Sequence, residues 1–156
     1  MNDDTTKTII TVLRHITLVR EALLSISQNL EKQMLRHDLS KFYEDEFFGF
    51  TQINRVAREH KYGSPEYQAS LRAVEPNPIK LHYSRNSHHP EHYKNGIDDM
   101  SLIDIIEMVA DWYAASLTYG QTSFEESLEI SIKRFNLTSE QAYLVRLIAR
   151  EIDDKG

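Results

Sequence analysis

The stretch SLIDIIEMVADWYAASLTYG, residues 101–120, contains the signals for both ends of one helix. Ser101 and Asp104 have the spacing of a capping box, with Asp in the place of the usual Glu. Gly120 is typical of the residue that ends a helix. The stretch therefore predicts one long helix, and Asp111 lies near its middle.

The rest of the chain shows the same helical periodicity between turn and cap residues, and the alternation typical of a strand is nowhere sustained. Residues 76–96, which contain three of the four prolines, are the least regular part and are expected to be rich in loops. We expect an all-α protein, a single compact domain over residues 1–156 with about six to seven helices. The predicted helices span residues 6–33, 43–60, 64–74, 101–119, 123–136 and 138–152.

The composition excludes several classes of protein. The chain has no cysteine, which excludes disulfides, thiolate metal sites and cysteine nucleophiles, and a reducing, cytoplasmic location is expected. The net charge of −6 disfavours binding to duplex nucleic acid, because phosphate backbones bind basic surfaces. No run of apolar residues is long enough to predict a membrane span, and the acidic N-terminal segment does not resemble a signal peptide. The last two predicted helices offer apolar residues for the core or for a homodimer surface.

Asp111 is an unusual residue for its position. Aspartate is a poor helix former, and the neighbours of Asp111 on the same helix face are Met108, Ala114 and Ala115. A carboxylate on an apolar face needs a partner, since burying it unpaired costs several kcal/mol. The partner could be a metal ion, and the alternative is an ion pair with an arginine or lysine.

Two further segments offer metal-binding side chains. His15 lies on the apolar stripe of the first predicted helix, where the alternative role is a core histidine bonded to a backbone carbonyl. His37 and Asp38 are adjacent, and Asp38 could instead cap the following helix. Together with Asp111 they make two imidazoles and two carboxylates, a set that suits one or two divalent ions such as Mn²⁺, Fe²⁺, Co²⁺, Ni²⁺, Zn²⁺ or Mg²⁺.

Three segments carry a resemblance to a known family. They are HITLVREAL, which begins at His15, RHDLSKF at residues 36–42, and MVADWYAA, which contains Asp111. Together they resemble the HD superfamily of metal-dependent phosphohydrolases. RHDLSKF is similar to the His-Asp-x-Gly-Lys box of that family, with Ser40 where Gly is usual, and an HD-like helical fold is implied. The box, the His-His pair and the Asp-Trp pair also resemble a small uncharacterised family found in bacteria and phages, which implies no chemistry.

The HD resemblance implies roles for individual residues. His15, His37, Asp38 and Asp111 would be metal ligands, with Asp38 best placed to bridge two ions. A metal-bound water would attack the phosphorus of a small phosphorylated substrate such as a nucleotide. Asp38 and Lys41 are the expected catalytic residues, and Lys41 would contact phosphate or a nearby carboxylate. The nucleotidase branch has a catalytic Glu at the position of Lys41, which argues against the specific mechanism of that branch.

The segment HYSRNSHHPEH, which begins at His82, contains four of the seven histidines. Some HD enzymes bind a second metal through extra histidines in this interval, so we expect His88 and His89, and then His82, to be ligands. The alternative is a polar loop whose histidines face solvent or pack on tyrosines. Arg85 and Asn86 are expected to bind the phosphate or sugar of a substrate, because arginine offers a planar bidentate fork.

The aromatic run from Phe42 to Phe50 is expected to form core that supports the box, with a base-stacking platform as the alternative. The acidic residues 44–46 are expected to form the solvated first turn of a helix. Glu46 could instead support the metal site.

Three functions compete at this point. The first is a metal-dependent phosphohydrolase acting on a nucleotide or another small phosphate ester. The second is a di-iron oxygenase, because the oxygenase branch of the HD superfamily uses six His and Asp ligands. The third is a helical interaction protein without catalysis, in which the same residues are structural.

Overall fold

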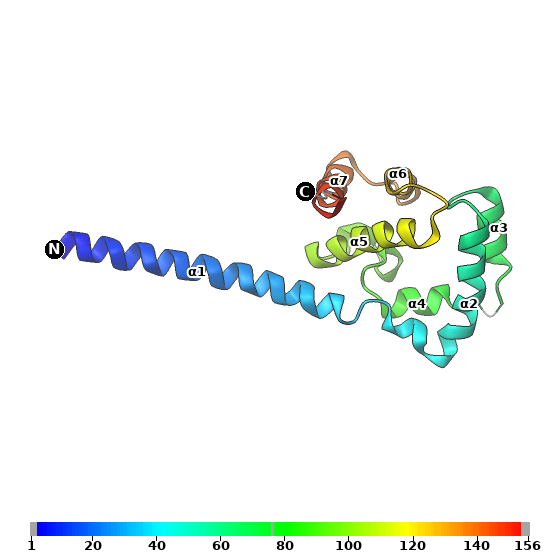
Figure 1. Cartoon of the computed structure of the whole chain (residues 1–156), viewed down its shortest axis with the longest axis horizontal. Coiled ribbons are helices and arrows are strands. Elements are labelled where there is room, and N and C mark those ends of the chain that lie inside the picture. Colours follow the sequence, from blue (N-terminus) through cyan, green and yellow to red (C-terminus); the bar gives the residue numbers. More distant parts are fainter. Residues whose placement is uncertain (1–2, 76, 154–156) are drawn as a thin grey trace. The chain divides into compact units, whose positions relative to one another are not determined.

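The computed structural model describes residues 3–75 and 77–153, and every regular element in these ranges is a helix (Figure 1). No strand occurs in the described part of the chain, which confirms the predicted all-α class. The α-helices are α1 (Asp3–Met34), α2 (Glu44–Glu59), α3 (Pro65–Arg72), α4 (Ile79–Arg85), α5 (Leu102–Tyr119), α6 (Phe124–Arg134) and α7 (Ser139–Asp153). Three short 3-10 helices lie between them, η1 (Leu39–Phe42), η2 (Pro90–His92) and η3 (Gly96–Asp99).

The predicted caps position α5. The Ser101 side chain accepts a hydrogen bond from the Asp104 backbone N–H, and the Asp104 carboxylate accepts one from the Ser101 N–H, so the capping box is confirmed. At the other end, Gly120 has a φ of +66°, the left-handed conformation that glycine enters without a steric penalty. Thr138 and Gln141 make a similar reciprocal pair before α7, at 2.9 and 3.2 Å.

The chain divides into two compact units, residues 1–36 and 37–156. The first unit consists of α1, and none of its described residues is buried. The apolar stripe predicted from the sequence lies on this helix, and its members Ile16 and Leu23 are exposed. The prediction of one domain over residues 1–156 stays a prediction.

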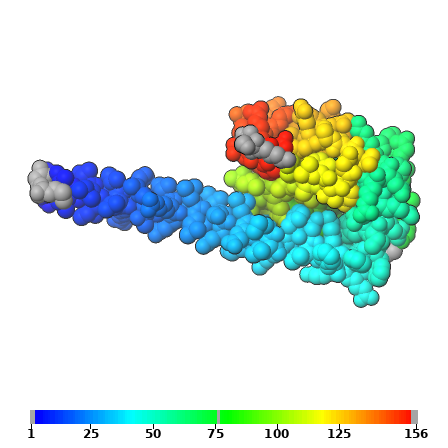
Figure 2. All heavy atoms as spheres, viewed as in Figure 1, coloured from blue at the N-terminus to red at the C-terminus, as the bar shows by residue number. Residues whose placement is uncertain are grey.

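The second unit contains two apolar clusters. The larger one lies among α5, α6 and α7 and has Met108, Val109 and Val145 at its most buried positions. The smaller one joins α2 and α3 around Phe50 and Ile53. A hydrogen bond of 2.7 Å from the Tyr119 hydroxyl on α5 to Asn54 on α2 links the helices of the two clusters. Figure 2 shows α2, α3 and the end of α5 as one continuous surface.

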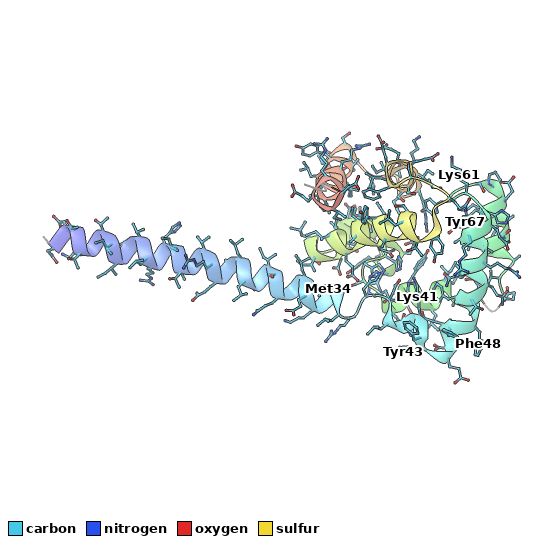
Figure 3. The ribbon with its side chains drawn as sticks, in the orientation of Figure 1. Met34, Lys41, Tyr43, Phe48, Lys61 and Tyr67 are labelled. Carbon is cyan, nitrogen blue, oxygen red and sulfur yellow. The ribbon has the colours of Figure 1, made fainter. Side chains whose placement is uncertain are left out.

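Residues 77–96 contain turns between short helices, as expected, and one of these, α4, was not predicted because it begins directly after Asn77 and Pro78. One expectation about local structure is wrong. The aromatic run is not core, because Phe42 is 75% exposed and Tyr43 and Phe48 are also exposed, whereas only Phe50 is buried. Tyr43 and Phe48 are labelled in Figure 3. The buried face of α2 contains Glu46, Gly49, Phe50 and Ile53, and Phe47 and Phe48 lie outside it.

None of the helices in the described ranges is both long and apolar enough to cross a membrane.

Candidate metal centre

Asp38 occupies an unusual backbone conformation just before η1. Its φ of +57° and ψ of +10° lie in the left-handed region, which only glycine and short polar residues such as Asp and Asn enter readily. The side chain makes no capping hydrogen bond with η1, so the alternative role of Asp38 as a helix cap is wrong. Instead, Oδ1 lies 3.2 Å from His82 Nε2 and 3.6 Å from His88 Nε2, and Oδ2 contacts the ammonium group of Lys41.

His82 is buried on α4 and is held from its far side. Its Nδ1 lies 3.0 Å from Oε2 of Glu46, a carboxylate with no exposed surface. The Ser40 hydroxyl donates to the same carboxylate oxygen at 3.0 Å. Because carboxylates commonly orient metal-binding histidines in this way, Glu46 fixes the ring with Nε2 directed at Asp38. The alternative that Glu46 supports the site therefore agrees with the structure, and the solvated reading is wrong for this residue.

The loop after α4 brings two more imidazoles to Asp38. In this loop, Ser87 donates a hydrogen bond of 2.6 Å to Asp104 at the start of α5. His88 is buried, and its Nδ1 lies 3.1 Å from Glu107 Oε1. The ring centroids of His88 and His89 are 4.1 Å apart. The capped start of α5 therefore sets the position of both histidines.

Glu107 and Asp111 lie one turn apart on α5 and hold His37 between them. His37 Nδ1 is 2.8 Å from Glu107 Oε1, and His37 Nε2 is 3.5 Å from Asp111 Oδ1. His37 Nε2 also lies 3.4 Å from Asp38 Oδ2. Glu107 thus contacts two imidazoles at once, those of His37 and His88.

These side chains form two overlapping groups of metal-binding atoms. The atoms of each group all lie within 4.8 Å of one another. The first group is Asp38, His82, His88 and His89, and the second is His37, Asp38, His88 and Asp111. Since Nδ1 of His88 faces Glu107, this ring has one nitrogen left for a metal. Asp38 has one oxygen toward each group, so it is the residue that could bridge two ions.

Several buried polar atoms of the first group lack hydrogen-bond partners among the described residues. Asp38 Oδ1 and the Nε2 atoms of His82, His88 and His89 are buried and have no hydrogen-bond partner among the described residues. Buried polar atoms without partners are rare in folded proteins, because each one costs about 1–3 kcal/mol. Here four of them converge on one point, and each can donate a lone pair to a cation. The residues present therefore fit a divalent metal ion.

The protonation states favour metal binding at the first group. Burial, followed by the neighbouring His88 and His82 rings, lowers the pKa of His89 to about 2, so its imidazole is neutral. Burial alone would raise the pKa of Asp38, but the His82 imidazole and the Lys41 charge outweigh it and hold that pKa well below its usual range. Metal ligands must be deprotonated, and both side chains meet this condition at neutral pH.

The second group differs because it holds a proton. Hydrogen bonds to Asp111 and then Glu107 raise the pKa of His37 to about 10, so the metal-free ring is protonated at neutral pH. A cation in this group would have to displace that proton. The first group is therefore closer to the protonation state that metal binding requires.

The remaining predicted residues are placed as follows. His15 is exposed on α1, in the first unit, and belongs to neither group, so its role as a ligand stays a prediction. Arg85 makes a bidentate pair with Asp45 and a further bond of 2.7 Å to Glu46. Asn86 is buried and donates to the Ser40 hydroxyl and the His82 carbonyl. These contacts support His82, and substrate binding by Arg85 and Asn86 stays a prediction.

Glu107 is the functional side chain that sequence reasoning missed. A signal was available, because Glu107 precedes Asp111 by four residues and therefore lies on the same face of the helix. Asp104 continues this row one turn earlier. Three carboxylates therefore recur about one turn apart along α5.

Residues 4–152 match the model of a family of unknown function, DUF5662. The match covers nearly the whole chain, and the chain therefore belongs to this family. No curated protein and no solved structure matches it. The resemblance to the HD superfamily stays a prediction.

Proposed function

We propose that this member of the DUF5662 family is a metal-dependent phosphohydrolase acting on a nucleotide or another small phosphate ester. One observation carries the proposal, the convergence of Asp38 Oδ1 with three imidazole Nε2 atoms that are buried without partners. Nitrogen and oxygen donors in this ratio suit Mn²⁺, Fe²⁺, Co²⁺, Ni²⁺ or Zn²⁺ better than Mg²⁺, which prefers oxygen ligands.

His37, Asp38, His82, His88, His89 and Asp111 would hold the metal. A divalent ion bound there would lower the pKa of a coordinated water and offset the negative charge of a phosphoryl group. Asp38 would be the shared ligand if two ions bind, since its two oxygens face different donor groups.

Lys41 supplies the positive charge that a phosphate needs. Its ammonium group contacts Asp38 Oδ2, and about a third of its side chain is exposed. An ammonium at this point can form a hydrogen bond to a phosphate oxygen and reduce the repulsion between the phosphate and Asp38. In this protein, Lys41 therefore binds and orients substrate rather than transferring a proton.

Glu46 and Glu107 keep the imidazoles in place while this happens. Each accepts from an Nδ1 atom, which fixes the tautomer and leaves Nε2 as the metal-binding nitrogen. Burial of Glu46 and of the His82 and His88 rings also limits the number of waters that can compete for the site.

The test is hydrolysis of a panel of nucleoside mono-, di- and triphosphates. The purified protein is treated with chelator, reloaded with Mn²⁺, Co²⁺ or Mg²⁺, and assayed for released phosphate and nucleoside. We expect activity with at least one ion, and we expect Asp38→Asn to abolish it. His92→Asn is a matched control, because His92 is exposed, belongs to neither donor group and uses its ring to bond the Tyr83 carbonyl.

A folded, metal-loaded protein that releases neither product with any ion would overturn the proposal. If chelator changes neither the metal content nor the melting temperature, the metal centre itself is refuted, because a bound ion must stabilise the native state. The protein would then be better explained as a helical interaction module.

A di-iron oxygenase is the second candidate. The observation in its favour is the number of donors, since four imidazoles and two carboxylates meet in the second unit. Metal analysis separates the two functions. About two irons per chain with oxygen consumption would favour the oxygenase, and one Mn or Zn would favour the hydrolase. A cytoplasmic location and a homodimer stay predictions from the sequence.

A further inference from the structure

A cavity of about 160 Å³ adjoins the metal centre within the second unit. His89 and Asp111, one residue from each donor group, form part of its wall. The other lining residues come from α2 to α6 and from the segments that join them, and Tyr67 on α3 is one of them (Figure 3). The cavity therefore connects the proposed reacting centre with side chains that belong to neither donor group.

Aromatic rings dominate this wall. The lining rings outside the donor groups are Tyr62, Tyr67, Tyr83, Trp112, Tyr119 and Phe135. The rings of Trp112 and Phe135 are nearly parallel, with an angle of 5° and centroids 5.9 Å apart. Flat rings of this kind stack on planar ligands. The volume suits a single ring, since an engineered cavity of about 150 Å³ in another protein holds a benzene molecule.

Among the described residues, the cavity wall carries no unpaired charge outside the donor groups. The other acidic and basic side chains that line it are Glu91 and Arg134, which pair at 2.6 Å. Arg134 also donates to the hydroxyls of Tyr62 and Tyr83, at 3.1 and 3.3 Å. Because the Arg134 guanidinium is engaged in these contacts, the wall suits an uncharged group and does not offer a second phosphate site.

A buried hydroxyl in the wall has no partner. Thr122 is 8% exposed, and its Oγ1 makes no hydrogen bond to any described residue. It lies in the segment between α5 and α6 and lines the cavity. A ligand that placed a hydrogen-bonding ring atom here would satisfy this hydroxyl, whereas a plain hydrocarbon ring would leave it unpaired.

We propose that this cavity binds the base of a nucleoside phosphate, that is, an uncharged aromatic ring with hydrogen-bonding atoms. The base stacks against the aromatic wall and pairs with Thr122, and its phosphate lies at the end formed by His89 and Asp111. The position of the phosphate rests on the proposed function, but the binding of the base does not.

The only tryptophan of the chain makes a direct test available, since Trp112 lines the cavity. Uridine, cytidine and ribose 5-phosphate are titrated separately into the metal-free protein while Trp112 fluorescence is recorded. We expect a nucleoside to quench the emission and ribose 5-phosphate at the same concentration to leave it unchanged. Equal responses to the nucleosides and to the sugar phosphate would overturn the inference.

Variants on one helix provide the matched comparison. Ala115→Leu places a larger side chain in the cavity and should abolish quenching, whereas Ala114→Leu adds the same group at an exposed position outside the wall. Thr122→Val removes the hydroxyl with little change of shape and should weaken nucleoside binding about fivefold. Bound metal per chain, measured on the same preparations, should be equal in all three variants.

The outcomes separate this inference from the proposed function. If nucleotides are hydrolysed but no nucleoside quenches Trp112 and Ala115→Leu is fully active, base binding by the cavity is refuted and the hydrolase stands. If nucleosides quench Trp112 and Ala115→Leu prevents it, while no phosphate is ever released, the cavity is supported and the hydrolase is refuted.

Discussion

Glu107 offers a direct test of the metal centre, because its single carboxylate holds two imidazoles. Oε1 lies 2.8 Å from His37 Nδ1 and 3.1 Å from His88 Nδ1. Burial would raise the pKa of Glu107, but hydrogen bonds from His37 and His88 outweigh it and lower that pKa to about 2. The carboxylate is therefore ionised at neutral pH. Glu107→Ala removes an acceptor from both rings without removing a metal ligand.

The size of the effect follows from the number of rings affected. Loss of a group that orients one metal-binding histidine weakens metal binding about 10–100-fold. Because Glu107 orients two histidines, we expect Glu107→Ala to weaken metal binding about 100-fold, which corresponds to about 2.7 kcal/mol of binding free energy. Glu107→Gln keeps an acceptor oxygen but loses the charge, so about tenfold is expected.

The assay is a competition titration of Mn²⁺ or Co²⁺ against a chelator of known affinity. Glu140→Gln, which neutralises an exposed carboxylate on α7, is the matched control and should bind like the wild type. Melting curves of the metal-free variants show whether each one is folded. Affinities of both folded Glu107 variants within about threefold of the wild type would refute the role assigned to Glu107.

Chelator should lower the melting temperature and fresh cation should restore it, since the ion binds only the native state; an unchanged melting curve contradicts this. The His37 pKa of about 10 exceeds its ordinary value of 6.5, so His37 stabilises the metal-free protein fully below pH 6.5 and loses this contribution as the pH rises through 10. Urea midpoints of the wild type and His37→Gln should therefore converge as the pH rises from neutrality to 10, and a constant difference would refute this. The HD resemblance predicts that His15→Ala lowers the bound metal per chain, and unchanged metal content would refute that ligand. Gly120→Ala should lower the free energy of unfolding by about 1 kcal/mol in thermal melts. The cause is the φ of +66° alone, because an added Cβ meets no atom within 4 Å. An unchanged free energy of unfolding would contradict the role of Gly120 as the helix cap.

The fold could be predicted from the sequence where local signals are strong. The capping box at Ser101 and the stop at Gly120 define α5 because both act through nearby backbone groups. The short helix α4 was missed, since a helix of seven residues shows too little periodicity and follows two turn residues. The exposure of Phe42 and Phe48 could not be predicted either, because hydrophobicity alone does not say which face of a helix finds a partner.

The sequence pointed to most of the side chains that meet in the candidate site, but to only one of the two glutamates that hold their imidazoles. Asp111 drew attention because a carboxylate on an apolar helix face needs a partner, and in the structure it faces His37. Histidines 82, 88 and 89 were identifiable from their density in one segment. The four-residue spacing places Glu107 on the helix face of Asp111, but its contacts with His37 and His88 depend on distant parts of the chain. Contacts of this kind arise from tertiary packing, which the order of residues does not display.

The left-handed backbone at Asp38 limits which residues fit this position without strain. Glutamate carries the same charge, but its longer side chain makes that backbone region less accessible, whereas asparagine enters it readily without a charge. Asp38→Glu keeps the carboxylate but strains the backbone, whereas Asp38→Asn keeps the backbone conformation but removes the charge. Comparing the two variants therefore separates the effect of backbone strain from the effect of losing a charged ligand. Asp38 thus combines two carboxylate oxygens with a backbone conformation that few residues adopt readily.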